Sequence, residues 1–206
     1  MVEHIYLVRH GETDFNLHNI VQGGGIDSVL NEKGKRQAEA LAQRLQGSGF
    51  QADIMFSSPL KRAKETADIL AKSLKQEVHT DSLLKEISCG NFEGQKWTEL
   101  DPIIVNRVRR DPKETYPGGE GILHVHQRAE KFIQKMENLP VKSILIVSHG
   151  HFLRCFATAL LSLEPLFTLQ LFQDNCAYSY FKKTEEFYKL IVWNDVSHSR
   201  DLLFDF

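Results

Sequence analysis

An arginine, a histidine and a glycine follow the first apolar run of the chain. Residues 5–8 read Ile-Tyr-Leu-Val, and Arg9, His10 and Gly11 come directly after them. A neutral imidazole can attack an electrophile and carry the transferred group covalently. The planar guanidinium can hold a phosphoryl group through two hydrogen bonds, and glycine lets that group approach the backbone. The trio therefore favours phosphoryl chemistry at His10 over an ordinary surface or core histidine.

A second histidine stands in a similar setting. The apolar run at 143–147 leads through Ser148 into His149 and Gly150. The imidazole of His149 could donate a hydrogen bond to the oxygens of a phosphoryl group in transfer. The alternative is a polar residue that only starts a helix after a buried strand. The repeated His-Gly pair favours the functional interpretation.

Two further side chains could complete such a site. Arg62 lies near the start of a predicted helix, whose N-terminus attracts anions. The alternative for Arg62 is a surface arginine that pairs with Glu65. Glu86 lies in an apolar stretch, which suits a general acid for the leaving oxygen and then a base for the attacking water. The alternative is an exposed glutamate in a mobile segment, and composition alone leaves both open.

Short apolar runs alternate with helical patterns along the chain, which is typical of an α/β sheet covered on both faces. Strands are predicted at residues 5–8, 53–56, 77–80 and 143–147, and helices at 31–45, 59–74 and 121–139, with a last helix that follows a break at 148–150 and runs through Leu161. Two further strands at 177–182 and 187–193 would add an antiparallel edge. We expect a three-layer αβα sandwich with a mostly parallel central sheet, formed as one domain over residues 1–206. The segment at about 87–117, broken by glycines and prolines, is predicted to be a short lid insertion.

Both His-Gly pairs would lie at the carboxyl ends of strands, where open α/β sheets bind ligands. If the two strands are neighbours, the imidazoles of His10 and His149 face each other across one pocket. Pro59 is expected to open the helix at 59–74, because proline costs nothing in the first turn.

Charge and cysteine content exclude several classes. The formal net charge is −2 and the basic residues are dispersed, which argues against a nucleic-acid partner. The three cysteines, at 89, 155 and 176, are expected to be reduced and mostly buried rather than paired or bound to zinc. No apolar run approaches a membrane span or a signal sequence, so we expect a cytoplasmic protein without a membrane partner. The pair His124 and His126 is expected to face solvent on a helix rather than bind metal.

Five sequence blocks, taken in order, resemble the histidine phosphatase superfamily, also called phosphoglycerate-mutase-like. These are Leu7 to Thr13 with Asn16 and Gln22-Gly23; Ser57 to Ala67; Leu84 to Glu86 with Gly90 and Phe92 to Gly94; Tyr116 to Glu120; and Val147 to His151. A single Arg-His-Gly is weak evidence, whereas five ordered blocks are strong. They cover most of residues 4–155.

The resemblance implies a role for each matching position. His10 would be the nucleophile, Glu86 the proton donor and acceptor, and Arg9, Arg62 and His149 the groups that bind and stabilise the phosphoryl group. Asn16, Gln22, Gly23 and the backbone of Gly150 would line the pocket. The family needs neither a metal nor another cofactor, because arginines and histidines supply the positive charge.

The family contains both phosphatases and mutases, and we favour a phosphatase. Mutases usually carry Gly-Trp after the first pocket loop, where this chain has Gln22-Gly23-Gly24-Gly25, and a longer arginine-rich insertion after the acid. A shorter lid should give water better access to a phosphohistidine. A cofactor-dependent phosphoglycerate mutase is the alternative, and a non-catalytic binding module on this fold is weighted low because His10 and Glu86 are both present. A metal hydrolase using the histidines is disfavoured, since two arginines would repel a cation.

The expected partner is a small phosphorylated metabolite whose identity the sequence leaves open. Basic and aromatic residues of the lid could add anion affinity if they face inward, and otherwise form a solvated helix face: Lys96, Trp97, Arg107, Arg109 and Arg110. His151 and Phe152 could shape the pocket. The antiparallel tail and the apolar end at residues 202–204 are compatible with a homodimer.

Overall fold

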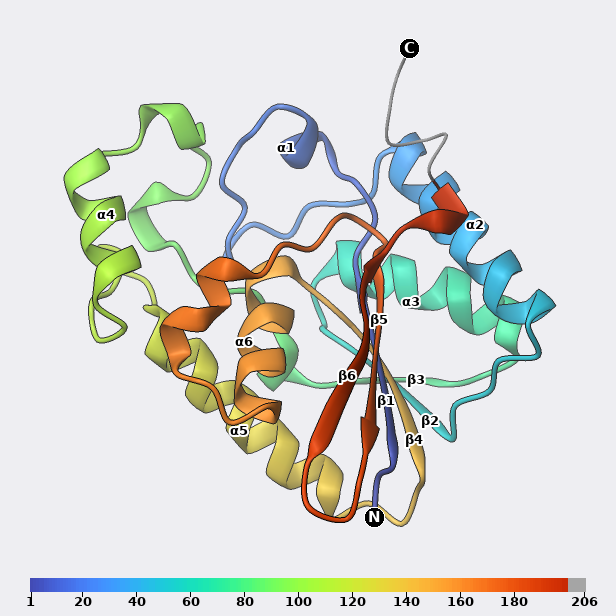
Figure 1. Ribbon diagram of the computed structural model, residues 1–206. Helices are drawn as coiled ribbons and strands as arrows, with labels where there is room; N and C mark the ends of the chain where they lie inside the picture. Colours follow the sequence, from blue (N-terminus) through green and yellow to red (C-terminus); the bar gives the residue numbers. More distant parts are fainter. Residues whose placement is uncertain (200–206) are drawn as a thin grey trace.

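The computed structural model of the protein describes residues 1–199. A six-stranded sheet in the order β3-β2-β4-β1-β5-β6 forms its centre (Figure 1). The strands are β1 (His4–Arg9), β2 (Ile54–Ser57), β3 (Val78–Thr80), β4 (Ser143–Ser148), β5 (Tyr178–Lys183) and β6 (Tyr188–Asp195). The first four pair in parallel, and β5 and β6 are antiparallel. The mostly parallel sheet with an antiparallel edge at the C-terminal end is therefore confirmed. The apolar residues 202–204 lie outside the described residues.

Helices cover both faces of this sheet (Figure 1). They are α1 (Asp14–Leu17), α2 (Glu32–Gly47), α3 (Lys61–Leu74), α4 (Pro102–Arg110), α5 (Ile122–Glu137) and α6 (Gly150–Leu160), with short 3-10 turns at Ser82–Leu84, Gly90–Phe92, Trp97–Glu99, Pro165–Gln170 and Ser197–Ser199. The segment at 87–117 contains α4 and two of these turns. In the described part of the chain, no helix is long and apolar enough to cross a membrane.

Alternation along the strands divides the core into two layers. Ile5 and Leu7 of β1 face one way and pack with α5 and α6, whereas Val8 faces the other way and packs with α2 and α3. This is the period of two that a strand imposes on its side chains. The two buried clusters are the two inner layers of an αβα sandwich.

The predicted start of α3, at Pro59, is wrong by two residues. Pro59 precedes the N-cap residue Leu60, whose ψ of 135° is extended, and the helix begins at Lys61. The N–H of Lys61 donates to the carboxylate of Asp27 at 2.6 Å, and the N–H of Arg62 donates to the carbonyl of Ser28 at 3.1 Å. A capping carboxylate from a distant segment therefore sets the start of α3, and local sequence cannot show it.

The loop after β1 packs directly against the first turn of α2. A Cβ on Gly34 would lie 2.1 Å from the carbonyl oxygen of Glu12, and one on Gly11 would lie 2.4 Å from the carbonyl oxygen of Gly34. Two glycines thus let two backbones touch. The N–H of Gly11 also donates to Thr66 Oγ1 at 3.0 Å, and the N–H of Glu12 donates to Gln37 Oε1 at 3.0 Å. Helices α2 and α3 therefore fix the loop that carries His10.

Gly34→Ala is expected to lower the free energy of unfolding by about 2 kcal/mol or more, because the added methyl group would meet rigid backbone. Gly47, at the other end of the same helix, has no atom within 4 Å of the place that a methyl group would take. Gly47→Ala should raise stability by up to about 1 kcal/mol through helix propensity. Urea denaturation of the two variants measures both effects, and similar changes in both would contradict the close contact.

Candidate active site

The two histidines of the paired strands meet at one end of the sheet. Strands β1 and β4 pair in parallel, with Val8 opposite Val147 and Arg9 opposite Ser148. The next residue of each chain segment is a histidine. The ring centroids of His10 and His149 lie 5.2 Å apart, with an angle of 60° between the planes. The two imidazoles are therefore neighbours, as predicted. They do not face each other across one pocket, because His149 is fully buried and is not among the residues that line the cavity at His10.

His10 is held in one tautomer by its neighbour. Its Nδ1 lies 2.7 Å from the carbonyl oxygen of Gly11. A carbonyl only accepts, so Nδ1 carries the proton and Nε2 keeps a free lone pair. Burial lowers the pKa of His10 well below its ordinary value, and the charges of Arg62 and Arg9 lower it further. The imidazole is thus neutral at physiological pH, as a nucleophile must be.

His149 lies behind His10, fully buried. Its Nε2 makes a 2.8 Å hydrogen bond with Ser58 Oγ, and its Nδ1 has no partner among the described residues. Burial lowers the pKa of His149 well below its ordinary value, and the positive charge of Arg62 adds to this. A buried polar nitrogen without a partner costs free energy, and a ligand can relieve that cost.

Two arginines approach the same place. Arg62 is buried, and its two terminal nitrogens donate to the carbonyls of Ile26 and Gly23 at 2.9 and 2.8 Å. Arg9 donates to the carbonyl of Gln173 at 2.6 Å. The Nε atoms of both arginines are buried without a partner among the described residues. Each guanidinium is therefore oriented by main-chain carbonyls, while one of its donors stays free.

The surface alternative for Arg62 is wrong. Its side chain is buried, and the carboxylate of Glu65 accepts instead from the N–H of Leu30 at 2.9 Å. Burial lowers the pKa of Arg62 to about 10, with the charge of Glu86 acting in the opposite direction. Arg62 therefore stays a cation in neutral solution.

The carboxylate of Glu86 lies against the first turn of α6. Its Oε2 accepts from the N–H of His151 at 3.1 Å, and its Oε1 accepts from the N–H groups of Phe152 and Ile87 at 3.0 and 2.9 Å. The sequence neighbours of Glu86 predicted apolar surroundings for its carboxyl group. That prediction is wrong, because the carboxyl oxygens accept hydrogen bonds from three backbone N–H groups. Glu86 also lines the same cavity as His10, which excludes the exposed, mobile alternative.

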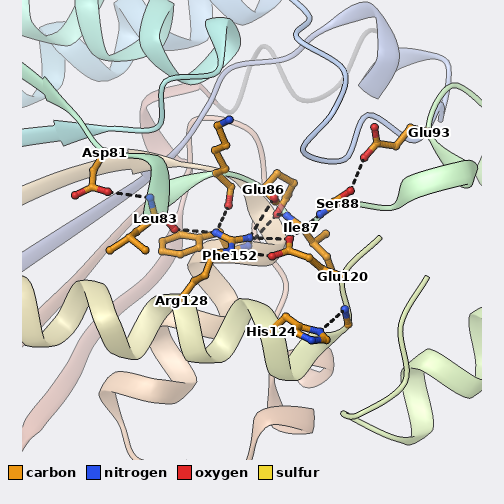
Figure 2. A network of polar contacts seen from close by, with 12 residues as sticks. Asp81, Leu83, Glu86, Ile87, Ser88, Glu93, Glu120, His124, Arg128 and Phe152 are labelled. Carbon is orange, nitrogen blue, oxygen red and sulfur yellow. Dashed lines mark hydrogen bonds and ion pairs between the residues drawn. The ribbon is translucent and has the colours of Figure 1, made fainter. Parts of the chain in front are cut away.

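The main chain around Glu86 is fixed by Arg128 of α5 (Figure 2). The guanidinium donates to the carbonyls of Leu83 and Lys85, both at 2.8 Å, and to that of Glu86 at 3.3 Å. Its other N–H groups form a two-pronged pair with Glu120 at 2.9 Å. A planar guanidinium can hold several acceptors at fixed angles in this way. Arg128 thus ties α5 to the segment that presents Glu86.

Glu120 also accepts from the N–H of Ser88 at 2.9 Å, two residues beyond Glu86 (Figure 2). Nearby, the carboxylate of Glu93 accepts from the N–H groups of Cys89 and Gly25 at 3.0 and 3.2 Å. Glu120 thus joins the segment at 86–89 to Arg128 of α5, and Glu93 joins it to the loop whose carbonyls orient Arg62. The acid-bearing and arginine-bearing parts of the site are therefore one hydrogen-bonded unit.

A cavity of about 200 Å³ joins most of the predicted site residues. Arg9, His10, Asn16, Gln22, Gly23, Arg62, Glu86 and Gly150 all line it, whereas His149 supports it from behind. Asn16 accepts from the N–H of Thr13 at 3.2 Å through its Oδ1. Gln22 accepts from the hydroxyl of Ser28. Gly23 adopts a φ of 54°, the left-handed region that glycine tolerates.

Several lining residues were not among the predicted site residues. Arg154 and Gln173 line the cavity, the first from α6 and the second from the loop before β5. Arg154 had one detectable signal, since it stands four residues after Gly150 and therefore on the same face of the predicted helix. The sequence offered no sign of Gln173. Of the lid residues named as candidates, Trp97 lines this cavity and Arg109 lines the next one, whereas Arg107 pairs with Glu114.

The expectation that His124 and His126 both face solvent is half wrong. His124 is exposed, but His126 is buried and lies 3.4 Å from the carboxylate of Glu130. Within residues 1–199, no three His, Cys, Asp or Glu side chains gather as metal ligands. The cysteines at 89, 155 and 176 are free and buried, as expected.

Three imidazoles of the site, those of His10, His149 and His151, should make stability fall as the pH is lowered. Burial holds all three pKa values well below the ordinary 6.5. Below about pH 6.5 the unfolded chain therefore binds protons that the folded chain does not. We expect each to cost roughly 1 kcal/mol of unfolding free energy between about pH 7.5 and 5.5 in urea denaturation.

His151→Gln should make this pH dependence shallower, because it removes one of the three buried groups. The exposed His18 provides the matched control, and His18→Gln should keep the wild-type slope. A His151→Gln variant with an unchanged slope would contradict the neutral state assigned to this imidazole.

Comparisons with known proteins agree with this geometry. The family model described as the histidine phosphatase superfamily (branch 1) matches residues 5–196. A Proteus mirabilis (strain HI4320) protein named "Probable phosphoglycerate mutase GpmB" is 31% identical over 211 residues, which covers 98% of this chain and 97% of that protein. The structure of an Entamoeba histolytica phosphoserine phosphatase in complex with phosphoserine is 29% identical, with a TM-score of 0.84 over 95% of this chain and 98% of that one.

A mycobacterial glucosyl-3-phosphoglycerate phosphatase, solved with VO3, is 27% identical, with a TM-score of 0.85 over 94% of this chain and 99% of that one. Phosphatase and mutase names thus both occur among the similar proteins, on one shared fold. The match over nearly the whole chain shows that this protein is an enzyme of the phosphatase type and a member of the histidine phosphatase superfamily.

Proposed function

We propose that this protein hydrolyses phosphate monoesters of small metabolites through a phosphohistidine at His10. The observation that carries the proposal is the convergence of a neutral imidazole, two arginines and a carboxylate on one cavity. The free lone pair of His10 Nε2 attacks phosphorus, and the bond from phosphorus to the leaving oxygen breaks. Water then attacks the phosphohistidine, and the bond from phosphorus to nitrogen breaks.

The unpartnered donors of the site suit the transferring group. Arg9 Nε, Arg62 Nε and His149 Nδ1 are buried and lack acceptors among the described residues. If Ser58 donates its hydroxyl proton to His149 Nε2, then Nδ1 carries the imidazole proton and can donate to a phosphoryl oxygen. Donors placed before the substrate arrives stabilise developing charge without reorganisation. In this proposal the protein supplies all the positive charge that the phosphoryl group needs.

Glu86 is proposed to move the proton in both half-reactions. It would protonate the leaving oxygen when the phosphohistidine forms and take the proton from water when it breaks down. Glu86 lines the same cavity as His10, and its carboxylate is held at the start of α6. Arg128 and Glu120 would serve as positioning residues, because they fix the main chain on either side of Glu86.

Water is the proposed acceptor of the phosphate, and a second substrate hydroxyl is the alternative. The similar proteins include a mutase name as well as phosphatase names. The short segment between Glu86 and Pro117 argues for water, because it lacks the arginine-rich insertion expected of a mutase. A single assay with two readouts separates the alternatives.

The wild-type protein is expected to release inorganic phosphate from a panel of metabolite monophosphates in the presence of a chelator. His10→Ala should lower the rate by more than about 1,000-fold, because no other group can carry the phosphate. Rapid quenching should trap acid-labile phosphate on the wild type and on the matched control His18→Ala, whose altered residue is exposed, but not on His10→Ala. Interconversion of phosphoglycerates without release would instead support a mutase, and full activity of His10→Ala would exclude the covalent route.

Glu86→Gln should separate proton transfer from a structural role. We expect a loss of about 100-fold or more toward an alkyl phosphate, whose leaving oxygen needs a proton. The loss toward p-nitrophenyl phosphate should be below about tenfold, because its leaving group is already stable as an anion. The exposed Glu77→Gln is the control for the charge change. Equal losses on both substrates would show that Glu86 acts by holding α6.

A further inference from the structure

Three side-chain amides line the cavity of the proposed phosphoryl site, those of Asn16, Gln22 and Gln173. The oxygen of Asn16 already accepts from the N–H and the hydroxyl of Thr13, at 3.2 and 3.0 Å. The oxygen of Gln22 accepts from the hydroxyl of Ser28. Gln173 differs from both, because neither its Oε1 nor its Nε2 has a partner among the described residues.

This free amide is buried rather than solvated. Gln173 is only 3% exposed, so bulk water does not satisfy its side chain. Buried polar groups without partners are uncommon in folded proteins, because the hydrogen bonds to water that they lose are not replaced. Since Gln173 lines the cavity, its missing partner can come from a molecule that enters there.

The loop before β5 holds the backbone of Gln173 beside a phosphoryl-binding group. The main-chain carbonyl of Gln173 accepts from the guanidinium of Arg9 at 2.6 Å. The preceding carbonyl, that of Phe172, accepts from the indole Nε1 of Trp193 in β6 at 2.7 Å. The backbone is therefore fixed from two sides, while the amide of the side chain stays free.

Hydrolysis of the phosphohistidine calls for one more acceptor than the machinery named above provides. The water oxygen attacks phosphorus, and the bond from phosphorus to His10 Nε2 breaks with its electron pair returning to the ring. One proton of the water goes to Glu86, and the other stays on the released phosphate. The carboxyl oxygens of Glu86 already accept from three backbone N–H groups, which leaves little room for both hydrogens of the water. Arg9 and Arg62 can only donate.

We infer that Gln173 is a catalytic residue whose Oε1 accepts a hydrogen bond from the attacking water. The inference rests on the proposed function, since it needs a phosphohistidine at His10. It also gives a physical reason for a preference for water. An alcohol has a single O–H hydrogen, which Glu86 takes, whereas water has a second one for Gln173. The amide of Gln173 thus favours hydrolysis over transfer of the phosphate to an alcohol.

Gln173→Met tests this role, because it keeps the length of the side chain and removes both polar atoms. With p-nitrophenyl phosphate in the presence of glycerol, p-nitrophenol counts the phosphohistidine formed, and inorganic phosphate counts the part that water hydrolyses. The variant should lower the ratio of hydrolysis to transfer by about tenfold, the size of one hydrogen bond in the transition state. Gln170→Met is the control and should keep the wild-type ratio, because Gln170 is exposed and does not line this cavity.

Two further measurements separate this role from a structural one. After rapid mixing, the phosphohistidine should decay about tenfold more slowly in Gln173→Met than in the wild type. An amide without partners contributes no hydrogen bond to the folded chain, so the variant should keep or raise the midpoint of urea denaturation. A strongly destabilised variant would contradict the free state of the amide and overturn the inference.

The outcomes also distinguish this inference from the proposed function. The ratio of hydrolysis to transfer is set after the phosphohistidine has formed, so it does not depend on the amount of folded protein. If the wild type forms phosphohistidine and Gln173→Met changes neither that ratio nor the decay, the role of Gln173 is wrong while the proposed function stands. If the wild type forms no phosphohistidine, the proposed function is rejected and the inference with it.

Discussion

The parallel pairing of β1 with β4 is the constraint on which the rest of the site depends. It aligns the last residue of each strand, so that the two following histidines come within 5.2 Å of each other. A shift of the register by one residue would turn each side chain to the opposite face. The core prevents that shift, because alternate residues of both strands are buried against different helix layers. The placement of the imidazoles is thus a consequence of hydrophobic packing.

Burying two guanidinium groups close together costs free energy, and hydrogen bonds to main-chain carbonyls offset part of that cost. Arg62 and Arg9 each donate to carbonyls that the surrounding loops hold in place, and these bonds replace some of the lost hydration. Burial lowers the pKa of His10 well below its ordinary value, and the same positive charge adds to this, so the imidazole stays neutral. One Nε on each arginine still lacks an acceptor among the described residues. The site therefore contains buried donors without acceptors, and an anion that binds there would form the missing hydrogen bonds.

A separate set of contacts sets the position of the carboxylate. Arg128 and Glu120 are far from Glu86 in sequence, yet they fix the main chain before and after it. This pair is partly buried, so solvent screens it less than it would screen a surface pair. The carboxylate itself is held by N–H groups of α6, the helix that begins immediately after His149. One helix start therefore connects the imidazole of His149, the proposed acid and two further cavity-lining residues, His151 and Arg154.

The local sequence determined where the strands and helices lie and which functional side chains follow them. The tertiary structure decided which atoms surround those side chains. Apolar alternation and helical spacing placed the strands and helices to within a few residues, because side-chain periodicity follows directly from backbone geometry. The repeated His-Gly pair gave the histidines their place at strand ends. Nothing local showed that Asp27 caps α3, that Glu86 meets backbone N–H groups, or that His126 is buried. Those features join segments far apart in the chain, and only the packed structure brings their atoms together.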